Sequence, residues 1–214
     1  MKKFIITAFL MVFAISIHAQ DNTKAKAILE GVSKQTKSYA TIDIAFTFTI
    51  HNSAKKSNET KTGTACMKGD KYWTEYSGQE IFCDGQTVWT YIKDNNEVQI
   101  NLNDPSSNDD LNPLKLLTDY NKTFSPKFIK EETRGPKILQ ILDLTPLKPG
   151  QFYKVRVEID KAQKQIVNAI IYDKNGVNTY TYTITKFVTN KTIPDTRFTF
   201  KTTDHPGIEV IDLR

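Results

Sequence analysis

The feature of the sequence that most constrains the fold is a strictly alternating run from Thr41 to Ile50. Successive side chains of a β-strand point to opposite faces, so the run predicts a strand with one fully apolar face and one nearly fully polar face. Such a strand belongs to an antiparallel sheet that is covered on one side and solvated on the other. The apolar face would consist of Ile42, Ile44, Phe46, Phe48 and Ile50.

Short aromatic-rich runs follow between Gly63 and Leu102. Turn-forming residues separate them at positions 68–70, 77–78, 84–85 and 93–96. The pattern predicts four or five antiparallel strands joined by tight turns. The inward face of the strand that contains Trp89 stays open at this point, because a slip of one residue at the preceding turn inverts it.

Two amphipathic helices are predicted to pack on the sheet. The first extends from Thr23 to Lys37, and its apolar stripe consists of Ala25, Ile28, Leu29 and Val32. The second begins at the Asn112–Pro113 pair, where asparagine caps the helix and proline takes the first helical position. It carries Leu114, Leu116 and Leu117. A connector helix packed on the core is the commoner interpretation of such a segment.

The second half of the chain returns to strands. They are predicted at residues 127–132, 138–144, 153–159, 165–172, 177–187 and 197–200, which gives ten or eleven strands in total. A sheet of that size normally curls or closes. The space that it encloses is either an apolar cavity, which would accept apolar ligands, or a fully packed core, and periodicity alone favours the packed core.

The N-terminus predicts export. Residues 1–19 have a positive start, an apolar run too short to span a bilayer, and a cleavage site after Ala19, as in a signal peptide. Gln20 would then come first, and a bacterial lipoprotein would need a cysteine there, so we expect residues 20–214 to form one domain without a lipid anchor. The formal net charge of +5 is spread along the chain and predicts no nucleic-acid partner.

The sequence offers little for catalysis. Beyond residue 19 it contains two histidines, His51 and His205, without neighbours at metal-ligand spacing, and no nucleophile or phosphate-binding motif. We therefore expect no enzyme activity, no cofactor and no metal. Cys66 and Cys83 are predicted on two strands that flank a third, roughly 9–10 Å apart, which is too far for a disulfide. Two buried thiols are the favoured interpretation.

Several motifs, in this order and spacing, resemble the LolA family of periplasmic carriers of outer-membrane lipoproteins, and particularly its versions in Bacteroides-like bacteria. The strongest is an Asp-Gly-x-x-hydrophobic-Trp-x-Tyr element at residues 84–91. The others are the capped first helix, the strand of residues 39–50, the strand-turn-strand of residues 63–76, the helix start at residues 112–114, and the terminal segments 197–200 and 205–212.

The resemblance implies a mainly β fold with a few helices, namely an unclosed, strongly curved antiparallel β-barrel with helices as a lid over an apolar cavity. It implies that acyl chains of lipoproteins, or other lipids, occupy that cavity while the carrier crosses the periplasm. The chain departs from the family at its first meander turn, Lys68–Gly69–Asp70, where proteobacterial members have an Arg-Pro pair that helps to hold the lid shut.

The leading hypothesis is a monomeric carrier that receives cargo from an inner-membrane lipoprotein-releasing transporter and gives it to an outer-membrane acceptor. One alternative is an envelope-stress sensor or interaction domain of the same fold, and another is a structural envelope protein with a packed core. The expected lipid-binding residues are Ile42, Ile44, Phe46, Phe48, Ile50, Trp73, Trp89, Tyr91, Leu114, Leu116 and Leu117.

Overall fold

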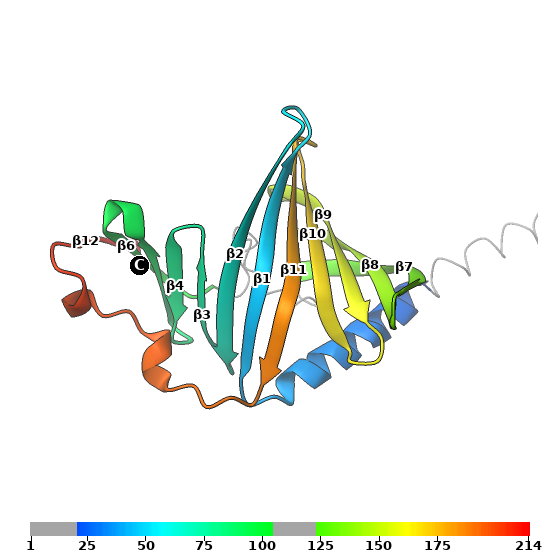
Figure 1. The fold of residues 1–214 in the computed structure, drawn as a ribbon, viewed down its shortest axis with the longest axis horizontal. Helices are drawn as coiled ribbons and strands as arrows, with labels where there is room; N and C mark the ends of the chain where they lie inside the picture. The colour runs from blue at the N-terminus through cyan, green and yellow to red at the C-terminus, as the bar shows by residue number, and fades with distance from the viewer. Residues whose placement is uncertain (1–20, 105–122) are drawn as a thin grey trace, which may run out of the picture.

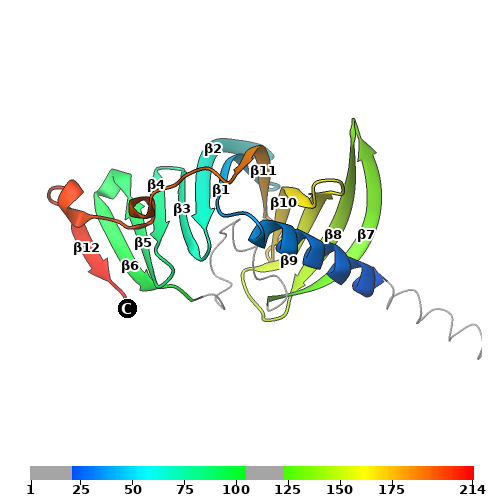
Figure 2. The same cartoon turned by 90° about the horizontal axis from the view of Figure 1, so that it is seen from below.

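The computed structural model describes residues 21–104 and 123–214, and within them one large curved sheet wraps around a helix (Figures 1 and 2). The helix comprises residues 21–37. The predicted signal peptide and the second predicted helix, with Leu114, Leu116 and Leu117, lie outside the described residues. In the described part the strands are β1 (Ile42–Asn52), β2 (Ser57–Lys68), β3 (Lys71–Tyr76), β4 (Gln79–Cys83), β5 (Thr87–Ile92), β6 (Glu97–Leu102), β7 (Phe124–Arg134), β8 (Lys137–Pro146), β9 (Phe152–Asp160), β10 (Gln165–Asp173), β11 (Asn178–Thr189) and β12 (Glu209–Asp212).

The alternating strand β1 lies in the middle of this sheet. The strand order is β12-β6-β5-β4-β3-β2-β1-β11-β10-β9-β8-β7, so β1 joins the two halves of the chain through β2 and β11. Neighbouring strands are antiparallel except β12, which is parallel to β6. The edge strands β12 and β7 are not joined, which confirms the predicted unclosed, curved sheet, with twelve described strands instead of ten or eleven.

Register shifts contribute to the curvature of the sheet. One lies between Ala45 and Phe46 in the β1–β11 pair, and another lies between Phe128 and Lys130 in the β7–β8 pair. Two more interrupt the β9–β10 pair. A bulge bends its strand and increases the local twist, so these shifts help to coil the sheet into a half-barrel.

The register defines an inner face, which is the face that carries the apolar side chains of β1. Ile44 lies opposite Ala65 of β2, and Phe48 lies opposite Tyr182 of β11. Residues opposite each other in an antiparallel pair point to the same side, so the apolar surface continues across both neighbours. The helix packs its apolar stripe against this inner face, as its pattern predicts.

The C-terminal segment crosses the opposite, outer face. We call residues 190–208 the strap; it contains the 3₁₀ turns η2 (Asp195–Phe198) and η3 (Thr202–Asp204) and leads from β11 to the edge strand β12 (Figure 1). The strand predicted at residues 197–200 is therefore wrong, because Phe198 and Phe200 pack on the outer face of the sheet instead of pairing within it.

The β1–β2 hairpin is longer than the alternating run of residues 41–50 indicates. The β1–β2 hairpin continues to Asn52 and resumes at Ser57, and this projecting end has no alternating apolar signal because it is solvated on both faces. Among the described helices, none is long and apolar enough to cross a bilayer.

Candidate functional site

The inner face forms one continuous apolar cluster. It gathers side chains from the helix, from β1 to β4, and from β8 to β11. Leu29 of the helix is 1% exposed, and Val157 of β9 is fully buried. Burial of an aliphatic side chain of this size stabilises the fold by about 1.5–3 kcal/mol, so the cluster is the main apolar core of the protein.

The helix is fixed to one half of the sheet. Near its start, the Lys24 ammonium group lies 3.6 Å from the centre of the Phe128 ring on β7 and 4.0 Å from the Glu131 carboxylate. Just after its end, the Tyr39 ring packs edge-on against Phe187 of β11, with ring centres 6.2 Å apart. These contacts place the helix across β7 to β11, and β3 to β6 extend away from it (Figure 2).

The inner face stays apolar on part of β3 to β5, where it extends beyond the helix, and becomes polar on β6. Tyr76 of β3, Ile81 of β4 and Val88 of β5 point to the inner side, because the register pairs them in line with the buried residues of β2 and β3. Each packs against the inner cluster but keeps part of its surface exposed. This half-exposed apolar surface is the part of the inner face that an apolar ligand could reach.

The structure brings part of the predicted site together. Ile42, Ile44, Phe46 and Phe48 are 1–6% exposed on the inner face, and Ile50 is half-buried at its edge. The first four therefore form a packed wall, and little of their surface faces solvent.

Trp73, Trp89 and Tyr91 are not part of that wall. The ladder pairs Trp73 with Phe82, Phe82 with Trp89, and Glu80 with Tyr91, and this row faces the outer side of the sheet. The sequence leaves the face of the Trp89 strand open, because β3 to β5 are apolar on both faces; the register places all three residues outside the proposed wall.

The strap contacts Trp73 and Tyr91 of this outer row. The Arg197 guanidinium lies 3.4 Å from the centre of the Trp73 ring, and Ile193 and Phe198 complete a small buried cluster with it. Further along, the Phe200 ring lies 5.4 Å from Tyr91. Aromatic pairs and cation–π contacts of this kind each add about 0.5–1.5 kcal/mol, so the outer cluster serves to hold the strap.

An aromatic group on the inner face was missed. Phe48 contacts Tyr76, Tyr180 and Tyr182, with ring centres 4.7–6.1 Å apart. Burial raises the pKa of the Tyr182 hydroxyl well above its usual value. The alternation of Tyr180, Tyr182 and Ile184 in β11 is the signal that could have found it.

Lys68, at the turn where the resemblance implies a lid latch, contacts the strap instead of the helix. Its ammonium group lies 2.8 Å from the Asp195 carboxylate, and Lys71 lies 3.3 Å from the same carboxylate. Hydrogen bonds from the two lysines hold the pKa of Asp195 below its usual value. In this chain the turn therefore stabilises the outer cover of the sheet.

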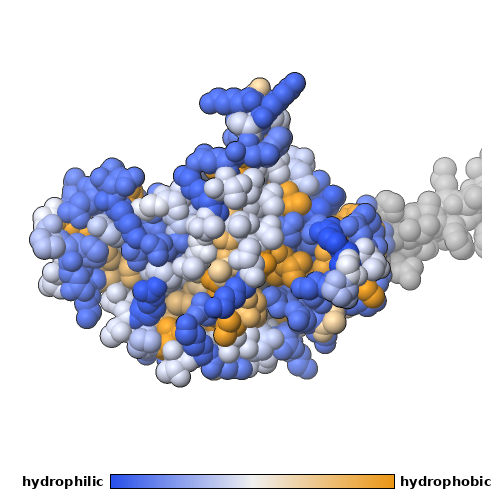
Figure 3. Space-filling view, in the orientation of Figure 1, coloured by the Kyte–Doolittle hydropathy of each residue, from blue (hydrophilic) through white to orange (hydrophobic). Residues whose placement is uncertain are grey.

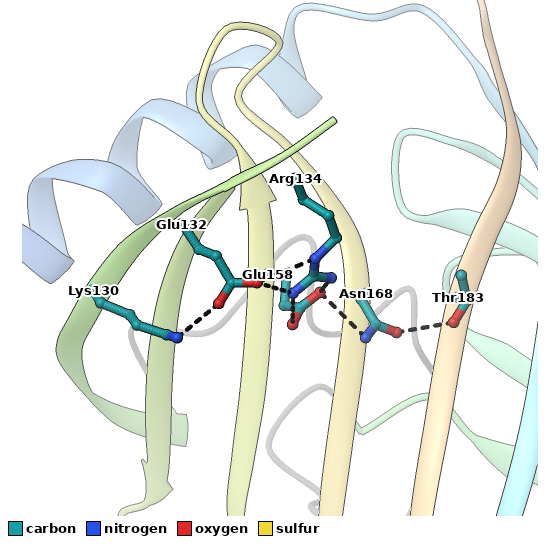
Figure 4. A network of polar contacts seen from close by, with 6 residues as sticks. All are labelled: Lys130, Glu132, Arg134, Glu158, Asn168 and Thr183. Atoms are coloured by element: carbon teal, nitrogen blue, oxygen red, sulfur yellow. Dashed lines mark hydrogen bonds and ion pairs between the residues drawn. The ribbon is translucent and has the colours of Figure 1, made fainter. Parts of the chain in front are cut away.

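A polar network crosses the outer face of the other half (Figure 4). The Glu158 carboxylate is nearly buried and accepts hydrogen bonds from two Arg134 nitrogens, at 2.7 and 3.2 Å, and from Asn168. Glu132 accepts hydrogen bonds from Lys130 and Arg134. These bonds, the one from Lys130 most of all, lower the pKa of Glu132 to about 2. The Glu132 carboxylate, held ionised by these contacts, is suited to cross-strand stabilisation and poorly suited to proton transfer at neutral pH.

The other described side chains that could bind a metal or react as nucleophiles do not gather into a site. Within residues 21–104 and 123–214 no cluster of three or more histidine, cysteine or carboxylate side chains is arranged to hold a metal. Cys66 and Cys83 are both buried, as predicted, on the two strands that flank β3. Cys66 points to the outer face and Cys83 to the inner face, so no disulfide joins them.

An open half-barrel with an apolar inner face and an amphipathic helix packed into it defines the class to which this protein belongs. The sequence narrows the class to a family: residues 37–201 match the model described as "Outer membrane lipoprotein carrier protein LolA", and the chain belongs to this family. A search of curated protein sequences finds no match for this chain.

One solved structure shows the same fold, and two others match at lower scores. An uncharacterized conserved protein from Thermus thermophilus is 12% identical, with a TM-score of 0.58 over 88% of this chain and 99% of its own. A LolA superfamily protein from Nitrosomonas europaea is 13% identical, with a TM-score of 0.47 over 82% and 97%. The MucA/MucB complex of Pseudomonas aeruginosa matches at 11% identity and a TM-score of 0.38 over 84% and 62%.

Proposed function

We infer that the protein is a periplasmic carrier that binds the acyl chains of lipoproteins, or of other lipids, against the inner face of its sheet. The observation that carries this proposal is the continuation of the apolar inner face beyond the helix, where Tyr76, Ile81 and Val88 remain partly exposed. Membership of the LolA family supports the same conclusion. The carrier acts by binding alone, without a cofactor.

The proposed cargo fits the energetics of such a surface. Burial of each methylene group is worth about 0.8 kcal/mol, so a chain of about fifteen methylenes could gain up to about 12 kcal/mol. A surface that is only partly sheltered from solvent gains a fraction of this binding free energy, so the cargo can still be released. We propose that an inner-membrane lipoprotein-releasing transporter loads the carrier and that an outer-membrane acceptor unloads it.

The test is uptake of a fluorescent fatty acid by residues 20–214. The variant Ile81→Gln/Val88→Gln places two amides on the half-exposed surface, and we expect affinity to fall about tenfold or more because apolar contact is replaced by groups that must be desolvated. The control Thr87→Gln alters the neighbouring outward position on β5 and should bind as the parent does. Phe46 is unsuitable for this test, because at 1% exposure a polar or charged side chain there would disrupt folding.

Unchanged uptake in the double variant, with thermal melting also unchanged, would show that acyl chains do not use this surface. Absence of uptake by the parent protein, together with a lack of lipid in mass spectra of the purified protein, would favour the envelope interaction domain or the structural protein instead.

A further inference from the structure

Three connections come together at the end of the sheet from which the β1–β2 hairpin projects (Figure 1). The backbone N–H of Ser53, in the β1–β2 turn, donates to the carbonyl of Val177 in the β10–β11 turn. The N–H of Lys174, in that same turn, donates to the carbonyl of Gln151 in the β8–β9 connection. We call residues 51–56, 147–154 and 173–177 the lysine rim, since hydrogen bonds tie these segments into one surface.

The lysine rim is strongly positively charged. It contains five lysines and a single acidic residue, Asp173, although the whole chain has 29 basic and 24 acidic residues. The carboxylate of Asp173 accepts a backbone N–H within its own turn. The lysines of the rim are Lys55, Lys56, Lys148, Lys154 and Lys174.

Most of these lysines are available to a partner. Lys154 is engaged, since its ammonium group lies 3.8 Å from the Asp143 carboxylate and 4.2 Å from the centre of the Tyr172 ring. The other four are exposed, and no carboxylate among the described residues lies within ion-pairing distance of them. In the view of Figure 3 the projecting end of β1 and β2 is mostly hydrophilic.

Exposed apolar side chains accompany the charges. Leu147 is 58% exposed, Tyr153 is 49% exposed and Val177 is 36% exposed, and all three belong to the rim. Lysines around a few exposed aliphatic and aromatic side chains match the surface of an anionic bilayer, where ammonium groups meet lipid phosphates and apolar groups reach the headgroup boundary.

We propose that the lysine rim docks the protein on an anionic membrane surface. Each lysine close to an anionic leaflet strengthens binding about fivefold, so the four exposed lysines give reversible attachment that salt weakens. The inference is independent of acyl-chain binding, because the rim uses the loops at one end of the sheet and the proposed cargo surface uses the inner face of β3 to β5.

The test measures binding of residues 20–214 to vesicles of phosphatidylcholine with and without phosphatidylglycerol. We expect binding to the anionic vesicles alone, with a loss at high salt. Lys55→Gln/Lys56→Gln should weaken binding about 25-fold, whereas Lys26→Gln/Lys37→Gln, an equal loss of charge on the exposed side of the helix, should weaken it less than about threefold.

A second variant tests the apolar contribution. Leu147→Ser changes an exposed side chain and leaves the charge unaltered, so we expect folding to be retained and binding to fall several-fold even at fixed salt. Equal binding to neutral and anionic vesicles, or equal losses in the rim and helix variants, would overturn the proposal. Self-association that the rim variant abolishes would also overturn it, by assigning the rim to a contact between copies.

Discussion

Gly63 has a specific role beneath Phe46, and replacing it tests the packing of the inner face. The two residues lie opposite each other in the β1–β2 pair. A Cβ atom at Gly63 would lie 2.5 and 2.7 Å from two Phe46 ring carbons and 2.9 Å from the backbone oxygen of Glu75. The ring cannot move freely, because it is 1% exposed and packs on Tyr76 and Tyr182.

Gly63→Ala should therefore destabilise the protein despite reducing the flexibility of the unfolded chain. Overpacking a core costs about 1–3 kcal/mol, and the backbone effect returns about 0.4–1 kcal/mol. The net loss in the free energy of unfolding is about 1–2 kcal/mol, or about 2–8 °C in Tm for a chain of this size. Urea unfolding followed by tryptophan fluorescence measures it.

Two further variants make the test specific. Gly150→Ala adds a Cβ with no atom within 4 Å and should be neutral or slightly stabilising. Phe46→Leu makes room for the new methyl group, so the double variant Gly63→Ala/Phe46→Leu should be more stable than the sum of the single losses by about 0.5–3 kcal/mol. Additive losses, or a stable Gly63→Ala variant, would refute the proposed contact.

Two other predictions concern the titratable groups. Because the pKa of Glu132 is lowered to about 2, its stabilising contribution is complete above about pH 4.5 and is lost as the pH falls toward 2; carboxyl NMR titration should give that midpoint, and Lys130→Gln should raise it. Cys66 and Cys83 should react with a thiol reagent only after unfolding, since both are buried and burial raises the pKa of the Cys66 thiol. Rapid labelling of the native protein, or fewer than two reactive thiols after unfolding without reductant, would contradict this.

The sequence predicts the central strand and the first helix well, and it predicts less well which segments cover each face of the sheet. The alternation of residues 41–50 identifies the central strand and its apolar face, because that strand is solvated on the other side. The stripe of the first helix likewise identifies the surface that packs inward. In both elements a single buried face leaves an unambiguous period in the sequence.

Strands β3 to β5 lack such a period. Tyr72 and Trp73 are both buried although they point to opposite faces, since the inner cluster covers one and the strap covers the other. The strap residue Arg197, which packs on Trp73, lies more than 120 positions after it in the sequence, and no local pattern shows where it will pack. The assignment of the aromatic residues to one wall failed for this reason.

Val88 and Trp89, adjacent residues of β5, lie on opposite faces of the sheet, and we expect one face to bind ligand and the other to stabilise the fold. Val88 points to the inner face, half-exposed beside the apolar cluster, and Trp89 points to the outer face, in the row that the strap contacts. A substitution at Val88 should therefore change ligand affinity with little effect on stability, whereas one at Trp89 should lower stability with little effect on affinity once the protein is folded. This division is expected of the proposed carrier, since the outer cover would keep the sheet rigid while the inner face exchanged cargo.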